Sequence, residues 1–179
     1  MQSIQTVSEN TIYVGASDRR LAKFENLFPI PRGVSYNAYV ILDEKTALLD
    51  TADASVGAQF LENVAAALDG RKLDYLIVDH MEPDHAAMIE AVLVRWPDLR
   101  LVVNAKTLPM LKMYFPTDNA AIDDALVVKE GDTLDLGKHK LTFVMAPMVH
   151  WPEVMMTFDT TTGTCLLYTS PSPRDVEES

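Results

Sequence analysis

The chain has few cysteines, few basic residues and no long apolar run, and each shortage excludes a class of protein. Its single cysteine, Cys165, excludes an internal disulfide and a metal site built from several cysteines, which suits a reducing compartment. Because 15 Lys and Arg stand against 26 Asp and Glu, the net charge is −11, which disfavours binding to nucleic acid or to an anionic membrane. No apolar run approaches the roughly 20 residues that span a bilayer. We therefore expect a cytoplasmic protein with no nucleic-acid partner and no membrane partner.

What the chain does contain is enough apolar sequence for a core. Hydrophobic residues make up 48% and charged residues 23% of its 179 residues, which is typical of a folded, water-soluble chain. That length accommodates one domain or a little more, since typical domains hold about 100 to 200 residues. Two complete catalytic domains do not fit.

Short β-like runs alternate with helical patterns along most of the chain. Strands are predicted at 11–15, 35–43, 46–50, 74–79, 100–104, 141–146 and 154–159 from β-branched and aromatic residues between turns. Apolar spacing predicts helices over 55–69, about 84–96, and 108–115. The alternating Leu134 and Leu136 predict one arm of a hairpin with the strand at 141–146. This order predicts an α/β domain with helices outside mixed sheets.

The last residues differ from the rest. From Thr169 the sequence reads T-S-P-S-P-R-D-V-E-E-S, which has one apolar residue and two prolines at alternate positions. Such a segment neither continues a strand nor buries surface. We expect residues 169–179 to be either a natural disordered tail or foreign sequence that replaces the true continuation of the chain.

The densest set of chemically capable side chains follows the predicted strand 74–79. The sequence there is H-M-E-P-D-H, from His80 to His85, immediately before a predicted helix. In an extended segment alternate residues share a side, so His80, Glu82 and Asp84 can converge on one cavity. Imidazole and carboxylate ligands suit iron, zinc or manganese. A polar loop with Asp84 as the helix N-cap explains Asp84 alone, so we predict a metal site.

A further histidine, His150, follows another predicted strand in the sequence P-M-V-H-W-P. Taken alone, it is equally explained as a loop histidine stacked on Trp151. Beside the first motif, it is a candidate to complete the coordination of a metal with His80 and Glu82.

Together, H-x-E-x-D-H and P-M-V-H-W-P resemble the metal-binding motifs of flavodiiron proteins. The stretches 33–39 and 48–51 are similar as well, and the likeness extends over about 11–158. The resemblance implies an α/β metallo-β-lactamase-like αββα sandwich, here incomplete, with a partial diiron domain at 1–168. Hydrolases of that superfamily carry a histidine where this chain has Glu82. The carboxylate favours the diiron branch, because a harder oxygen donor suits the redox chemistry of iron.

The resemblance also implies a role for each ligand. His80, Glu82 and His150 are expected to hold one iron, and Asp84 and His85 to serve a second. The bridging aspartate of the family is expected near Thr169, where the atypical segment begins, and its last histidine has no candidate after His150. We therefore expect a truncated flavodiiron protein that lacks the FMN-bearing domain.

The implied function is an oxidoreductase that reduces dioxygen or nitric oxide at a non-haem diiron centre. By resemblance, electrons arrive from FMN, the full-length protein is a head-to-tail homodimer, and the redox donor is a rubredoxin or a reductase. Two alternatives stay open: a metallo-β-lactamase-fold hydrolase, and an inactive metal-binding fragment.

Four residues that are not predicted metal ligands also have expected positions. Asp50 ends an apolar strand at the same edge as His80, where a supporting hydrogen bond to a ligand histidine and a plain turn are equally good explanations. Trp151 is expected to form part of a dry apolar wall at the site. His139, between two lysines, is expected on the surface, and Cys165 is expected in the core.

Overall fold

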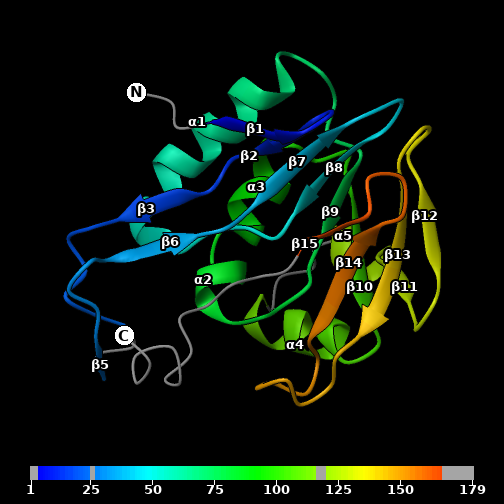
Figure 1. Cartoon of the computed structure of the whole chain (residues 1–179). Coiled ribbons are helices and arrows are strands. Elements are labelled where there is room, and N and C mark those ends of the chain that lie inside the picture. The colour runs from blue at the N-terminus through cyan, green and yellow to red at the C-terminus, as the bar shows by residue number, and fades with distance from the viewer. Residues whose placement is uncertain (1–3, 25–26, 116–119, 167–179) are drawn as a thin grey trace.

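The computed structural model describes residues 4–24, 27–115 and 120–166 (Figure 1). The segment 169–179 lies outside these ranges, so its expected character stays a prediction. None of the described helices is long and apolar enough to cross a membrane.

A seven-stranded mixed sheet forms the centre of the molecule. Its strands, in spatial order, are β1 (Gln5–Ser8), β2 (Thr11–Tyr13), β7 (Tyr39–Leu42), β8 (Thr46–Leu49), β9 (Tyr75–Ile77), β10 (Arg100–Asn104) and β11 (Leu126–Val128). Neighbours from β1 to β8 are antiparallel, and neighbours from β8 to β11 are parallel. The carboxyl ends of β8 to β11 therefore meet at one edge of the sheet, which is where α/β folds place ligands.

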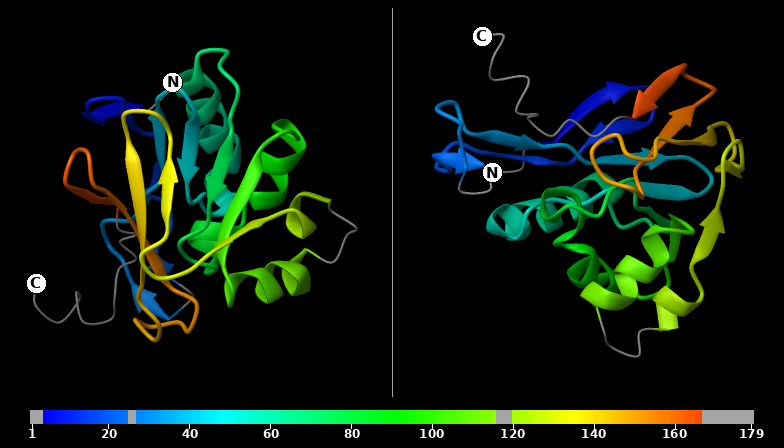
Figure 2. Two further views of the ribbon diagram at one scale, coloured as in Figure 1. Left: turned by 90° about the vertical axis from the view of Figure 1, so that its right-hand side faces the viewer. Right: turned by 90° about the horizontal axis from the view of Figure 1, so that it is seen from below.

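A second, antiparallel sheet faces the first (Figure 2). It contains, in order, β12 (Thr133–Asp135), β13 (Lys140–Met145), β14 (Met155–Asp159) and β15 (Thr164–Leu166). Two small pairs extend beyond the sheets: β3 (Ala16–Asp18) with β6 (Val34–Tyr36), and β4 (Lys23–Phe24) with β5 (Phe28–Pro29).

Helices cover the other face of the first sheet (Figures 1 and 2). They are the 3₁₀ turn Ala54–Val56, α1 (Gly57–Leu68), α2 (Pro83–Ala86), α3 (Ile89–Arg95), α4 (Thr107–Tyr114) and α5 (Ala120–Asp123). The described layers are thus helix, sheet and sheet, which confirms the predicted α/β layering.

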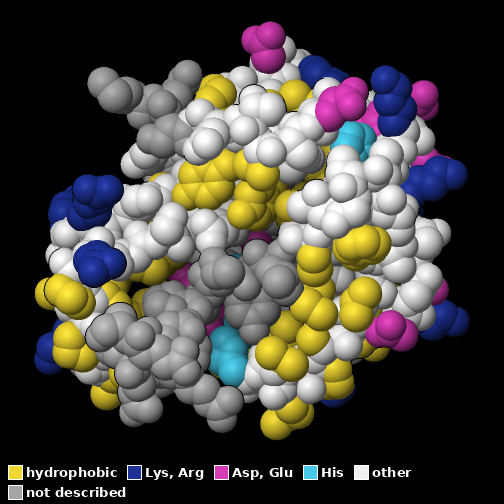
Figure 3. Space-filling model, viewed as in Figure 1, with side chains coloured by type: hydrophobic (Ala, Val, Ile, Leu, Met, Phe, Trp, Pro, Cys, Tyr) yellow, Lys and Arg dark blue, Asp and Glu magenta, His cyan; other side chains and the backbone are white. Residues whose placement is uncertain are grey.

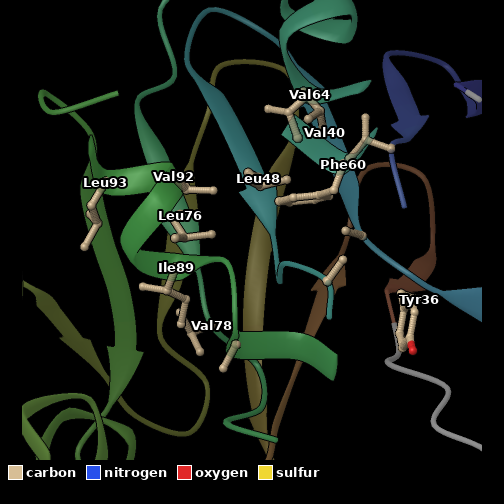
Figure 4. Packing of buried hydrophobic residues seen from close by; sticks show 14 of the residues in the cluster. Tyr36, Val40, Leu48, Phe60, Val64, Leu76, Val78, Ile89, Val92 and Leu93 are labelled. Atoms are coloured by element: carbon tan, nitrogen blue, oxygen red, sulfur yellow. The ribbon is translucent and has the colours of Figure 1, made fainter. Parts of the chain in front are cut away.

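The two-residue alternation of the central strands explains both cores. Val40, Leu48 and Leu76 point to the helices, where they pack near Phe60 and Val64 of α1 (Figure 4). Their neighbours point the other way into the sheet–sheet core, which consists of Ile41, Ala47, Leu49, Ile77, Val102, Val128, Leu134, Leu136, Leu141, Phe143, Met155 and Leu166. A strand buried on both faces is mostly apolar, as β8 is: Ala47, Leu48 and Leu49 follow Thr46, whose hydroxyl donates to the Lys72 carbonyl.

Two predicted elements are each divided in two. The strand predicted at 35–43 is β6 and β7, which belong to different sheets. The helix predicted at about 84–96 is α2 and α3, interrupted because Thr51 takes the hydrogen bonds that would continue it. The carbonyl of His85 accepts from the backbone N–H and the hydroxyl of Thr51, at 2.8 and 2.6 Å. The N–H of Met88 then donates to the Thr51 hydroxyl instead of to the carbonyl four residues back.

Two single-residue predictions are wrong. His139 is 2% exposed, because its hairpin turn folds against neighbouring turns, where its backbone N–H donates to Asp43 and its Nδ1 lies 2.8 Å from Asp159 Oδ2. Cys165 is exposed, because the alternation along β15 places Leu166 inward and Cys165 outward.

Candidate metal centre

The loop after β9 presents its side chains at the carboxyl edge of the parallel strands. Pro83 occupies the first position of α2, where its missing N–H costs nothing, and Glu82 before it is extended at φ −62° and ψ 144°. Pro83 itself is exposed, but the other side chains from His80 to His85 are at most 6% exposed. No side-chain cap hydrogen bond forms at Glu82, the N-cap residue of α2, so helix capping does not explain this cluster.

The second loop, between β13 and β14, carries His150. Met148 and His150 both have left-handed backbone angles, with φ of 65° and 57°. Such angles cost about 1–3 kcal/mol in a residue other than glycine and are concentrated at functional sites. The fold of the loop is fixed by a hydrogen bond from the Met148 N–H to the Trp151 carbonyl at 2.9 Å.

The two loops bring three ligand atoms together. His80 Nε2 lies 3.0 Å, and His150 Nε2 2.9 Å, from the same oxygen, Glu82 Oε2. Ligand atoms of these three residues all lie within 4.8 Å of one another. Two imidazole nitrogens and a carboxylate oxygen are a donor set for a divalent transition metal, so the residues fit the metal that the sequence predicts.

Asp84 and His85 lie beside this group but do not join it. The ring of His85 is 5.3 Å from that of His80, centroid to centroid, and its Nε2 is 3.6 Å from Asp84 Oδ2. The two side chains are close enough to each other to be candidate donors for a second ion. The described residues supply these two donors for it, and the segment where sequence resemblance expects a bridging aspartate lies outside them.

Carboxylates stand behind two of the histidines. Asp50 Oδ2 lies 3.0 Å from His85 Nδ1, so the strand-end aspartate is in place to support that ring. Glu153 Oε1 lies 2.8 Å from His80 Nδ1, and sequence reasoning missed this residue. In the sequence, Glu153 is marked only by being an acidic residue three positions after His150, which does not indicate its partner.

Trp151 lies edge-on to His80, with ring centroids 5.3 Å apart and planes at 87°. Its ring is 6.3 Å from that of His150, so it does not stack face to face on the histidine beside it. The indole therefore forms an apolar wall against the buried ring of His80.

Burial and hydrogen bonding oppose each other in setting the charges of the site. Burial disfavours the imidazolium form of His80, but hydrogen bonds with Glu153 and Glu82 outweigh it and raise the pKa of His80 to about 9. Burial raises the pKa of Asp84 above its ordinary value. The raised pKa of Asp79, at the end of β9, has the same main cause, to which the nearby Asp50 adds.

A cavity of about 300 Å³ opens beside the cluster. Glu82 and Asp84 form part of its wall, and the opposite side includes Tyr36, whose burial raises the pKa of its hydroxyl to about 12. On the surface shown in Figure 3, histidine and acidic side chains lie in a hollow next to hydrophobic ones. The site therefore has room for a small ligand.

The chain matches the model of a known protein family. The model of the family described as "ODP family beta lactamase" matches residues 34–170, which include both motifs. The chain belongs to the ODP beta-lactamase family. The family match confirms the metallo-β-lactamase-like fold that the sequence resemblance implied.

Two relatives in sequence are nitric oxide reductases by name. A "Nitric oxide reductase" of Moorella thermoacetica is 36% identical over 85% of this chain. An "Anaerobic nitric oxide reductase flavorubredoxin" of Klebsiella pneumoniae is 35% identical over 92% of it. The chain spans only 38% and 33% of the lengths of these two proteins.

Solved structures of flavodiiron-type proteins have the same fold as this chain. A rubredoxin oxygen:oxidoreductase from Desulfovibrio gigas superposes with a TM-score of 0.82 at 31% identity, over 88% of this chain and 38% of that one. A mutant flavo di-iron protein from Thermotoga maritima gives 0.79 at 26% identity, over 89% and 40%. The resemblance to flavodiiron proteins is confirmed.

Proposed function

We propose that residues 1–168 are part of a diiron domain in an oxidoreductase that reduces dioxygen or nitric oxide. The observation that carries this proposal is the convergence of His80 Nε2 and His150 Nε2 on Glu82 Oε2. A carboxylate in that position supplies the harder donor that iron prefers. The names of the relatives support the same reaction class.

In this proposal, His80, Glu82 and His150 hold one iron, and Asp84 and His85 bind the second. When bound, the irons supply the redox chemistry for reducing a diatomic substrate. The chain orients the ligands: Asp50 holds His85 through Nδ1, and Trp151 limits access of water to His80. The cavity beside Glu82 and Asp84 admits the substrate.

Electrons require partners that these residues do not provide. We propose FMN on a further domain as the immediate donor, a head-to-tail homodimer that brings flavin and irons together, and a rubredoxin or reductase upstream. Support comes from the word flavorubredoxin in the name of one relative and rubredoxin in that of another, and from the part of their length that this chain spans. We propose the cytoplasm as its location.

The reaction can be tested on the chain itself. After anaerobic loading with Fe²⁺, a single addition of O₂ or NO should be consumed faster than by the same concentration of free Fe²⁺, as measured with an electrode. Glu82→Gln should abolish the excess rate, because the amide cannot supply an anionic ligand.

The hydrolase alternative makes the opposite prediction. Zn²⁺-loaded chain would then hydrolyse a β-lactam or thioester substrate, and Glu82→His would preserve or increase that rate. Hydrolysis without any excess consumption of O₂ or NO would overturn the proposal. Iron binding without either activity would identify an inactive metal-binding fragment.

A further inference from the structure

We infer that Glu153 is a positioning residue that fixes the orientation of His80 and ties the loop of His150 to the loop of His80. The role of Glu153 in metal binding rests on the proposed function. Its hydrogen bonds to His80 and Met81 do not depend on that proposal. Glu153 follows His150 by three residues in sequence, yet its carboxylate lies against His80, which is in the loop after β9 of the first sheet.

The hydrogen bonds determine which nitrogen of His80 is presented to the site. Glu153 Oε1 accepts the backbone N–H of Met81 at 3.1 Å, and His80 Nδ1 lies 2.8 Å from the same oxygen. A carboxylate accepts and does not donate, so the proton between the ring and Glu153 is on Nδ1. His80 therefore presents Nε2 to Glu82, and the ring cannot flip without losing the bond to Glu153.

Glu153 is itself held by the end of β10. The side-chain amide of Asn104 donates to the Glu153 carbonyl at 2.5 Å. The side-chain oxygen of Asn104, Oδ1, accepts from the backbone N–H groups of Lys106 and Thr107, at 2.9 and 3.0 Å, at the start of α4. Lys106 Nζ adds a bond to the carbonyl of Pro152 at 3.1 Å. These bonds anchor the segment just after His150 to the first sheet.

The Glu153 side chain therefore helps to set the distance between His80 and His150, the two histidines of the ligand group. His80 comes from the loop after β9 and His150 from the loop between β13 and β14. A bond from Met155 N–H to the Asp79 carbonyl at 3.0 Å joins the same two elements behind Glu153. Removing the carboxylate frees the ring of His80 while leaving this backbone bond, so the effect should fall on the site more than on the fold.

The test measures Zn²⁺ affinity together with the ring protons of His80. Zn²⁺ is the probe because it is redox-inert and diamagnetic. Glu153→Leu should weaken Zn²⁺ binding about 10- to 100-fold, the usual loss when a carboxylate behind a ligand histidine is removed. In ¹H–¹⁵N spectra, the Nδ1 proton of His80 should be protected from exchange with solvent in wild type and lost in the variant. Glu153→Gln retains an acceptor oxygen, so it should keep most of the Zn²⁺ affinity and most of the protection of the His80 Nδ1 proton.

The matched control is Asp159→Asn, which changes the carboxylate of a histidine pair remote from the site, and should leave Zn²⁺ affinity unchanged. Unaltered affinity and an unaltered His80 proton in folded Glu153→Leu would overturn the inference. If Glu153→Leu fails to fold, Glu153→Gln decides: a loss of affinity equal to that of His80→Ala, or no protected proton, contradicts the inference. If wild type binds no Zn²⁺, the proposed function fails, while the metal-free spectra still test the role of Glu153.

Discussion

Each of three buried histidines lies within 3.0 Å of a carboxylate oxygen, but only some of these pairs belong to the candidate site. His80 and His139 both meet a carboxylate through Nδ1 at 2.8 Å. They differ in what their rings face: His80 Nε2 points at Glu82 and shares it with His150. The His139 pair therefore stabilises the fold alone, whereas at His80 a second carboxylate and a second histidine meet the opposite nitrogen and form the candidate metal site.

The pair at His139 predicts a pH dependence of stability. Burial raises the pKa of Asp159, but hydrogen bonds from Thr162, His139 and Thr161 outweigh it and hold the pKa below its ordinary value. A lowered carboxyl pKa contributes stability above the unfolded pKa of about 3.9, and this contribution is lost as pH falls through the folded pKa. Asp159→Asn should therefore lower the free energy of unfolding by about 1 kcal/mol at pH 7.

Urea unfolding of wild type and Asp159→Asn at several pH values measures this difference. It should stay constant from pH 7 to about pH 5 and shrink below about pH 4. A difference that grows on acidification would contradict the assigned role of the ionised carboxylate.

Among the structural elements, the β3–β6 pair depends on a glycine. Gly33 has φ of +77°, and a Cβ there would lie 2.3 Å from the Asp18 carbonyl oxygen. Gly70 has a similar φ of +80°, but a Cβ there would meet nothing within 4 Å. Gly70→Ala should cost about 1–2 kcal/mol from backbone strain alone, and Gly33→Ala clearly more. The two losses of stability can be compared by thermal unfolding of both variants. Equal losses would show that the close approach of Gly33 to Asp18 is unimportant.

The contact between the two sheets depends on large buried side chains of β13. Phe143 is completely buried in that core. Phe143→Ala should destabilise the chain by about 3–5 kcal/mol, because it leaves a cavity between the sheets. Val127→Ala, on a 45% exposed side chain of β11, should change stability by about 0.5 kcal/mol or less. Chemical denaturation distinguishes the two, and a small effect at Phe143 would mean that the sheets are held elsewhere.

Sequence periodicity predicted the long elements well and their interruptions poorly. The predicted strand 100–104 is β10 as observed, and the predicted helix 108–115 is α4 shifted by one residue. The gap between α2 and α3 was not predictable, because it arises from Thr51, which is distant in sequence. Some of the shortest strands, such as β4 and β11, were missed, because two or three residues show little alternation.

The candidate site shows the same division between local and long-range information. Ligand type and spacing within 80–85 indicated His80 and Glu82 directly, and the second motif added His150. Glu153 could not be predicted from spacing, since its partner His80 is 73 residues away. Burial of His139 was missed for the same reason: Asp43, from the turn after β7, and Asp159, at the end of β14, reach it from elsewhere in the chain.

For the molecule as a whole, the site is a junction between two sheets. The first sheet supplies His80 and Glu82 from its carboxyl edge, and the second supplies His150. Formation of the site therefore requires both sheets to pack correctly.

The most direct test of the account is whether Fe²⁺ binds at this junction. Anaerobic equilibrium dialysis of the whole chain should give at least one tightly bound Fe²⁺, which is lost in His150→Ala. The control is His139→Gln, a change at a buried histidine that lies outside the group of three ligands, and it should bind Fe²⁺ as wild type does. Equal Fe²⁺ binding by wild type and by His150→Ala would contradict the assignment of His80, Glu82 and His150 as the metal ligands.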